Sequence, residues 1–149
     1  MNTAVDRDDL YGFECDFLAL DQTGSIALIS SAGYGPIPWL VLNDGLSVEA
    51  AVAGIQALPV IGTPLDLRGE DRSDDYSDSF EMSRRGFYAY DWHDSRGPYM
   101  QVSAPSIALR EDGVAPEIAR AAGLLRLPIQ FAETVQLSLD EHGVYPGQH

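Results

Sequence analysis

The sequence lacks several features that define large classes of protein. It has a single cysteine, Cys15, so it cannot form an internal disulfide, and no group of residues has the spacing of a zinc site. No apolar run approaches the roughly 20 residues that a membrane span needs. The first residues, MNTAVDRDDL, are acidic and contain no apolar segment of the kind found in secretory signals. We therefore expect a cytoplasmic protein without a membrane span, a bound metal or a cofactor.

Positive charge is also scarce, and lysine is absent. Nine arginines stand against 23 aspartates and glutamates, which gives a formal net charge of −14. Such a charge repels phosphate backbones, so we expect no direct binding of nucleic acid. It would attract a basic protein and speed that encounter. A high negative charge also keeps many proteins soluble without any further role, and this second interpretation stays open.

The length and composition indicate one domain. With 149 residues, of which 45% are hydrophobic, the chain can bury a genuine core. We expect a single globular domain over residues 1–149, an exposed acidic loop at 69–85, and mobile ends at 1–9 and 141–149. Nothing in the sequence indicates an oligomeric state.

The spacing of apolar residues predicts an α+β fold. It favours a mostly antiparallel sheet of about five to six strands with one or two helices packed on it. Short turns rich in glycine or serine separate the paired strands, and Pro59 and Gly123 end the two helices. The expected elements are a hairpin of strands 13–20 and 25–31, a helix over 47–58 with Ser47 as its N-cap, a second hairpin of strands 86–94 and 98–106, a helix over 114–123, and a final strand over 129–139.

A glycine-rich segment, SSAGYGPIP, follows the first hairpin. Glycine loops after strands often hold phosphate, but such loops lead directly into a helix. Here Pro36 and Pro38 bias the preceding residues away from helical conformation, and the third glycine and the lysine of phosphate-binding loops are missing. We interpret the segment as a sharp bend with Tyr34 exposed at its tip.

The acidic loop is the strongest candidate for a binding surface. Residues 66–81 contain seven carboxylates and two arginines, a local charge of −5, and Tyr76 and Phe80 lie among them. Carboxylates interleaved with aromatic residues suit a basic cleft on another protein, whereas the alternative is a loop that is only solvated. The residues expected to bind a partner are Tyr34, Asp71, Asp74, Asp75, Tyr76, Asp78, Phe80 and Glu81.

Candidates for catalysis carry weaker signals. His93 lies between Asp91 and Asp94, and Ser30 or Ser31 would complete a triad with it, but no nucleophile-elbow motif is present. Glu14 and Asp16 lie on one side of a strand, a spacing that general acid–base catalysis can use and that a solvated strand face also produces. The sequence therefore predicts no catalytic residue.

Two further patterns leave alternatives open. Glu133 falls in the apolar register of the last predicted strand, so either a β-bulge turns it outward or an arginine pairs with it inside. Tyr88, Tyr90 and Trp92 alternate along a strand as an aromatic stripe, which forms either part of the core or a recognition surface.

The chain resembles a group of short, acidic bacterial proteins, the immunity proteins of polymorphic toxin systems. The likeness covers most of residues 11–139. It is carried by FLALDQTGSIALISSAGYGPIP, RRGFYAYDWHD and GPYMQVSAPS, with the landmarks Asp21-x-x-Gly24, Ala32–Pro36 and Gly86–Asp91. The resemblance implies a small cytosolic antidote that binds and neutralises a cognate toxin domain, and it identifies no active site.

The expected function is therefore binding of a basic toxin domain, with no enzymatic activity. Two alternatives from other classes remain. One is a small ligand-sensing module with a pocket between sheet and helix, and the other is a small hydrolase that uses His93 and nearby carboxylates. A flat acidic face favours the antidote, an apolar cavity favours the sensor, and carboxylates that converge with His93 in a deep pocket favour the hydrolase.

Overall fold

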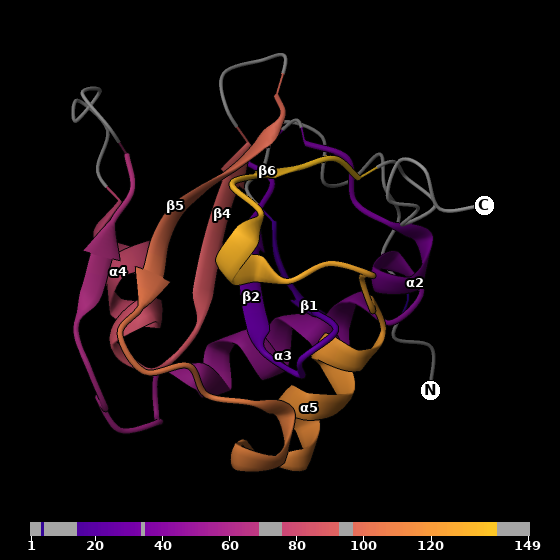
Figure 1. The fold of residues 1–149 in the computed structure, drawn as a ribbon. Helices are drawn as coiled ribbons and strands as arrows, with labels where there is room; N and C mark the ends of the chain where they lie inside the picture. Colours follow the sequence, from indigo (N-terminus) through magenta and orange to yellow (C-terminus); the bar gives the residue numbers. More distant parts are fainter. Residues whose placement is uncertain (1–3, 5–14, 34, 69–75, 93–96, 140–149) are drawn as a thin grey trace.

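The structure is a computed structural model that describes Ala4 and residues 15–33, 35–68, 76–92 and 97–139. It confirms the α+β class, with helices packed on a six-stranded sheet (Figure 1). The elements in chain order are β1 (Asp16–Leu20), β2 (Ile26–Ser30), α2 (Trp39–Leu42), α3 (Gly45–Ile55), β3 (Pro64–Asp66), α4 (Ser77–Arg84), β4 (Tyr88–Trp92), β5 (Tyr99–Pro105), the 3-10 turn η1 (Glu111–Gly113), α5 (Pro116–Gly123), the 3-10 turn η2 (Phe131–Glu133) and β6 (Gln136–Leu137).

The sheet has the strand order β1-β2-β4-β5-β3, and β6 also pairs with β5. Both predicted hairpins are confirmed: β1 pairs antiparallel with β2, Asp16 opposite Ser30, and β4 pairs antiparallel with β5. The two hairpins join through β2 and β4, which run parallel, so the sheet is mixed rather than purely antiparallel. The chain between these parallel strands carries α2, α3, β3 and α4.

Asp21 closes the first hairpin. Its Oδ1 accepts hydrogen bonds from the backbone amides of Thr23 and Ser25 at 2.9 and 3.0 Å, and from the Thr23 hydroxyl at 2.8 Å. Gly24 has a φ of +85°, the left-handed conformation expected of a glycine at this place. The Asp21 carboxylate therefore organises the turn that sets the register of β1 and β2.

The sheet is covered on both faces. Ser103 of β5 bonds to Ser83 of α4 on one face, while the rings of Tyr88 and Tyr90 on the other face lie 5.7 Å from that of Phe131. The C-terminal segment, yellow in Figure 1, crosses the strands there. Because both faces are covered, Phe17 to Leu20 and all of β2 are buried rather than alternating with solvated residues.

The aromatic stripe belongs to the core, as one of the two interpretations predicted. Tyr90 is 1% exposed, and Trp92 packs its ring 4.9 Å from that of Tyr99. The Tyr90 hydroxyl accepts a hydrogen bond of 2.8 Å from Gln101, and the same Gln101 amide donates to the carbonyl of Phe131 at 2.8 Å. These bonds fasten the C-terminal segment to the sheet.

The predicted final strand over 129–139 is wrong. The segment folds as η2 followed by the two-residue β6, because Phe131 turns inward to pack on Tyr88 and Tyr90. Val135, placed on the buried side by the alternation, is 56% exposed. Glu133 is exposed in the 3-10 turn, so both explanations offered for it, a β-bulge and a buried ion pair, are wrong.

Both predicted helices are present. α5 lies within the predicted 114–123, and α3 runs from Gly45 to Ile55, so it begins before Ser47 and ends before Leu58. Asp44, rather than Ser47, is the N-cap residue of α3. Val48 and Ile55 of α3 are buried, as their stripe predicts, and α5 packs beside α3 (Figure 1).

The prediction of an exposed loop over 69–85 is wrong for its second half, which forms α4. This helix buries Ser79, Met82 and Ser83, of which only the methionine is an apolar residue. Polar contacts therefore hold much of the buried side of α4, and a search for apolar periodicity misses it. Residues 69–75 and 141–149, and residues 1–9 except Ala4, lie outside the part of the chain that the structure describes.

Candidate functional site

The residues expected to bind a partner divide into two groups. Tyr76 is the N-cap residue of α4, and Asp78, Phe80 and Glu81 lie within this helix. The other four, Tyr34, Asp71, Asp74 and Asp75, lie outside the described residues. In the sequence the last three of these directly precede α4.

The two aromatic residues of this group lie under an arginine. The Arg68 guanidinium is 4.9 Å from the centre of the Phe80 ring and 5.8 Å from that of Tyr76. Asp66 holds this guanidinium with hydrogen bonds of 3.0 Å from Nε and 2.9 Å from Nη2. Cation–π contacts of this kind stabilise by about 0.5–1 kcal/mol at exposed sites. Tyr76 and Phe80 are thus half-buried parts of a local cluster rather than projecting anchors.

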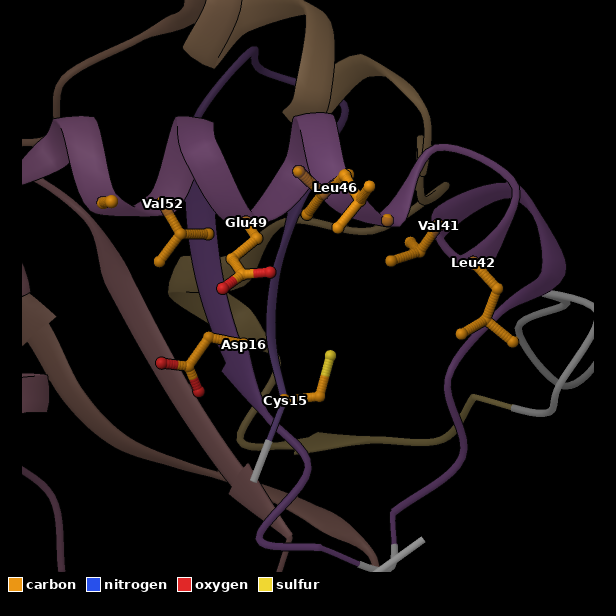
Figure 2. Close-up of a pocket in the computed structure, with 10 residues that line it drawn as sticks. Cys15, Asp16, Val41, Leu42, Leu46, Glu49 and Val52 are labelled. Carbon is orange, nitrogen blue, oxygen red and sulfur yellow. The ribbon is translucent and has the colours of Figure 1, made fainter. Parts of the chain in front are cut away.

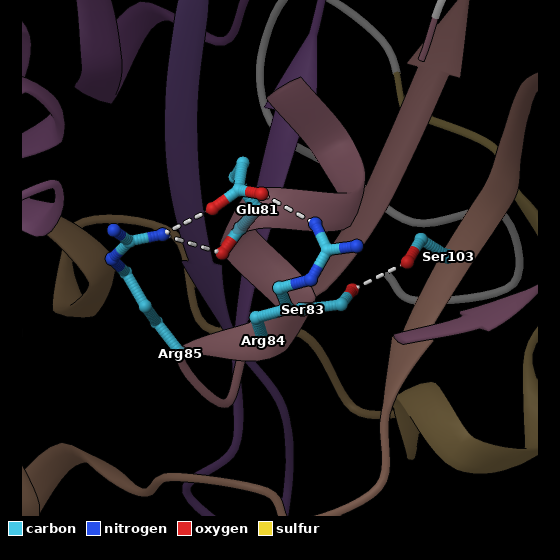
Figure 3. A network of polar contacts seen from close by, with 5 residues as sticks. All are labelled: Glu81, Ser83, Arg84, Arg85 and Ser103. Carbon is cyan, nitrogen blue, oxygen red and sulfur yellow. Dashed lines mark hydrogen bonds and ion pairs between the residues drawn. The ribbon is translucent and has the colours of Figure 1, made fainter. Parts of the chain in front are cut away.

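Glu81 is exposed but paired with two arginines of its own helix (Figure 3). Its carboxylate contacts Arg84 and accepts a hydrogen bond of 3.0 Å from Arg85. The hydrogen bond from Arg85 is the main cause that lowers the pKa of Glu81. Its negative charge is therefore largely offset within the molecule.

Asp78 differs from Glu81 because no arginine in the described part of the chain forms an ion pair with it. It is exposed in the first turn of α4, where negative charge suits the helix dipole. Its charge reaches Asp16 at the start of β1, whose pKa is raised first by burial and then by Asp78. The Asp16 carboxylate accepts a hydrogen bond of 2.8 Å from the Ser30 hydroxyl, which partly offsets this rise.

Glu49 extends this run of carboxylates onto α3. Glu49 is exposed. The pKa of the Cys15 thiol is raised mainly by burial, and the charges of Asp16 and Glu49 raise it further. Among the residues that the structure describes, none of Glu49, Asp16 and Asp78 forms an ion pair. We call Glu49, Asp16 and Asp78 the acidic strip.

A pocket of about 440 Å³ opens beside the acidic strip. It lies between β1 and the helices α2 and α3, and Asp16 and Glu49 form part of its wall (Figure 2). The rest is mainly aliphatic, and burial raises the pKa of Cys15 to about 11, so its thiol is neutral at physiological pH. The other lining residues are Val41, Leu42, Gly45, Leu46, Val48, Val52 and Ala53.

The serines considered for catalysis have structural partners. The Ser30 hydroxyl donates to Asp16, and Ser31 Oγ accepts hydrogen bonds from the amides of Cys15 at 2.9 Å and Gly33 at 3.3 Å. Glu14, His93 and Asp94 lie outside the described residues, so the proposed triad has no geometry to assess. Ser31 instead shapes the bend that follows β2.

The glycine-rich bend has a packing role at Gly35. A Cβ atom there would overlap the Tyr99 hydroxyl and lie 2.8 Å from Tyr99 Cζ, so only glycine fits. The same hydroxyl donates a hydrogen bond of 2.9 Å to the carbonyl of Pro36. Tyr99 thereby holds the chain as it leaves the hairpin toward α2.

Comparison with protein-family models, with curated proteins and with solved structures found no match to this chain. Within the described ranges, no group of three or more histidine, cysteine or acidic residues is placed to hold a metal ion. No described helix combines the length and apolar character needed to cross a bilayer.

Sequence reasoning missed the convergence of Glu49, Asp16 and Asp78. The three residues come from α3, β1 and α4, and only the fold brings them together. The sequence does hold one signal for Glu49, which follows the stripe residue Val48 and therefore lies beside the buried face of α3. The spacing of residues does not reveal that this edge of α3 lies near Asp16 of β1.

Proposed function

We propose that this protein binds a basic protein domain through its acidic strip and acts as an immunity protein that blocks a cognate toxin. The observation that carries the proposal is the acidic strip itself, three neighbouring carboxylates without an arginine partner among the described residues. Several carboxylates elsewhere do have an arginine partner: Asp44 pairs with Arg120 at 2.7 Å, and Asp66 pairs with Arg68 at 2.9 Å.

Charge of this kind supports fast capture. A net charge of −14 raises the local concentration of a basic partner, and an uncompensated strip directs its approach. Asp16 supports the proposal in a second way. Burial and the nearby charge of Asp78 disfavour its ionised carboxylate, and a cation bound beside it would stabilise that charge. The sequence before α4 adds three further negative charges, Asp71, Asp74 and Asp75.

The proposal is tested by measuring association with the protein encoded by the adjacent gene, using surface plasmon resonance at 50 and 500 mM NaCl. The variant Glu49→Gln/Asp78→Asn removes two charges of the strip and keeps the side-chain shapes. We expect its association rate at low salt to fall by about threefold to tenfold, because rim charges act mainly on association. At high salt, where the Debye length is about 4 Å, the difference should nearly vanish.

The matched control is Asp112→Asn/Glu133→Gln, which removes the same number of charges from exposed positions in η1 and η2. Equal slowing in both variants would mean that net charge alone matters and would remove the strip from the interface. The variant Asp71→Asn/Asp74→Asn/Asp75→Asn tests the segment before α4 in the same way. A complete lack of association with the neighbouring gene product would leave the immunity function without support.

A further inference from the structure

The pocket beside the acidic strip combines two chemistries. Its aliphatic wall comes from α2 and α3, where Val41, Leu42 and Val48 are buried and Leu46 remains 53% exposed at the surface. Its polar wall contains the carboxylates of Asp16 and Glu49. The pocket volume of about 440 Å³ falls within the usual range of about 300–1,000 Å³ for sites that bind small molecules.

The two carboxylates face the same space from opposite elements. Figure 2 shows Glu49 reaching down from α3 toward Asp16 on β1, with the Cys15 thiol pointing toward α3 beside them. The Ser30 hydroxyl bonds to Asp16 Oδ1, and no other donor from the described residues bonds to this carboxylate. Among the described residues that line the pocket, none is an arginine or a histidine.

We propose that this pocket binds a small organic cation, an ammonium group carried on an aliphatic stem. The ammonium would lie between the carboxylates of Asp16 and Glu49, and the stem would lie along Leu46 and Val52. An ammonium group supplies three donors to these acceptors, and the stem buries apolar surface at about 25 cal/mol per Å².

The charge of the pocket selects this ligand class over its neutral and anionic counterparts. An anion would be repelled by two carboxylates and by the field of the whole chain. A neutral alcohol of the same length would gain the stem contacts alone. A cation would gain both, and it would also relieve the unfavourable placement of the Asp16 charge, which burial and Asp78 disfavour.

The experiment compares three probes that differ only in the head group: n-hexylammonium, hexan-1-ol and hexanoate. Each is titrated into the full-length protein at pH 7, and the dissociation constant is taken from amide chemical shifts in nuclear magnetic resonance spectra. We expect n-hexylammonium to bind about tenfold more tightly than hexan-1-ol. Hexanoate should show no binding. The amides of Cys15, Asp16 and Glu49 should shift most.

Variants separate the head group from the stem. Glu49→Gln and Asp16→Asn should each weaken n-hexylammonium by about threefold to tenfold and leave hexan-1-ol unchanged, whereas Leu46→Ala should weaken both probes equally. The control Asp112→Asn/Glu133→Gln should leave both unchanged. Equal affinities for the amine and the alcohol, or the same loss in the control as in Glu49→Gln, would overturn the proposal. The test uses the isolated protein, so its result is independent of any binding to a toxin.

Discussion

At the scale of single residues, Asp21 links parts of the chain that are far apart in sequence. Its Oδ1 organises the hairpin turn, and its Oδ2 accepts a hydrogen bond of 2.9 Å from the amide of Phe131. The side chain is 7% exposed, so these bonds are sheltered from water. One carboxylate thus joins the turn of the first hairpin to the C-terminal segment, which covers the face of the sheet that carries Tyr88 and Tyr90.

We expect Asp21→Ala to lower the free energy of unfolding by about 2–6 kcal/mol. The change leaves the buried amides of Ser25 and Phe131 without their acceptor, and each such loss is typically about 1–3 kcal/mol. Asp21→Asn should lower it by less, because one oxygen still accepts from Ser25 while the new amide group faces the Phe131 N–H. Urea denaturation followed by circular dichroism measures both changes.

The exposed Asp112→Asn serves as control and should change the free energy of unfolding by less than about 0.5 kcal/mol. An Asp21→Ala protein as stable as this control would show that the four hydrogen bonds of Asp21 contribute little. The role of Asp21 in the turn was predictable from the spacing Asp21-x-x-Gly24. Its bond to Phe131 was not, because a contact across 110 positions leaves no trace in local spacing.

At the scale of elements, the sequence predicted those that apolar periodicity defines. The paired strands β1 and β2 and the helices α3 and α5 were all expected, because each buries a stripe or run of aliphatic residues. The alternation over 129–139 predicted one strand, but Phe131 is buried from the 3-10 turn η2 and Leu137 from the two-residue strand β6. The alternation therefore identified some of the buried residues, but it failed at Val135, which is 56% exposed, and it did not reveal the backbone path.

α4 was missed because serine hydroxyls replace aliphatic contacts on its buried side. Ser83 donates to the carbonyl of Phe87 at 2.9 Å and bonds to Ser103 at 2.6 Å, as Figure 3 shows for the second contact. Charges rather than apolar spacing marked this helix, with Asp78 in its first turn, Arg84 in its last and Glu81 four residues before Arg85. The candidate site depends on α4, so the same omission hid the position of Asp78 near Asp16.

α3 carries a glycine that the fold does not require. A Cβ atom on Gly54 would meet nothing within 4 Å, and the residue lies on the exposed side near the end of the helix. We expect Gly54→Ala to raise the free energy of unfolding by about 0.5–1 kcal/mol, because alanine loses less backbone entropy in a helix. For a chain of this size such a gain raises the melting temperature by about 1–4 °C, which thermal denaturation detects.

Gly35→Ala is the matched comparison, since the same methyl group is added where Tyr99 fills the space. It should lower the free energy of unfolding by about 1–3 kcal/mol, the usual effect of overpacking. Stabilisation by both alanines, or by neither, would contradict the packing described around these two glycines.

At the scale of the whole molecule, the net charge of −14 opposes compactness. Like charges repel more strongly in the folded chain, where they lie closer together than in the unfolded chain. The ion pairs that oppose this repulsion, such as Arg126 with Glu111 at 3.8 Å, lie mostly at the surface, where each contributes about 0–1 kcal/mol. The acidic strip, which lacks such pairs among the described residues, adds to the unfavourable term in the free protein.

Salt should therefore stabilise this protein. Raising NaCl from 10 to 150 mM shortens the Debye length from about 30 to about 8 Å, which screens the long-range repulsion of the whole chain more than contacts between neighbouring charges. We expect the melting temperature to rise over this range, with most of the rise below 150 mM. The variant Glu49→Gln/Asp78→Asn, with two fewer negative charges, should melt at a higher temperature at 10 mM and show a smaller rise. A melting temperature that falls as salt is added would mean that the surface ion pairs outweigh the net repulsion. Repulsion within the acidic strip would then not destabilise the free protein, and a basic partner would gain nothing by reducing it.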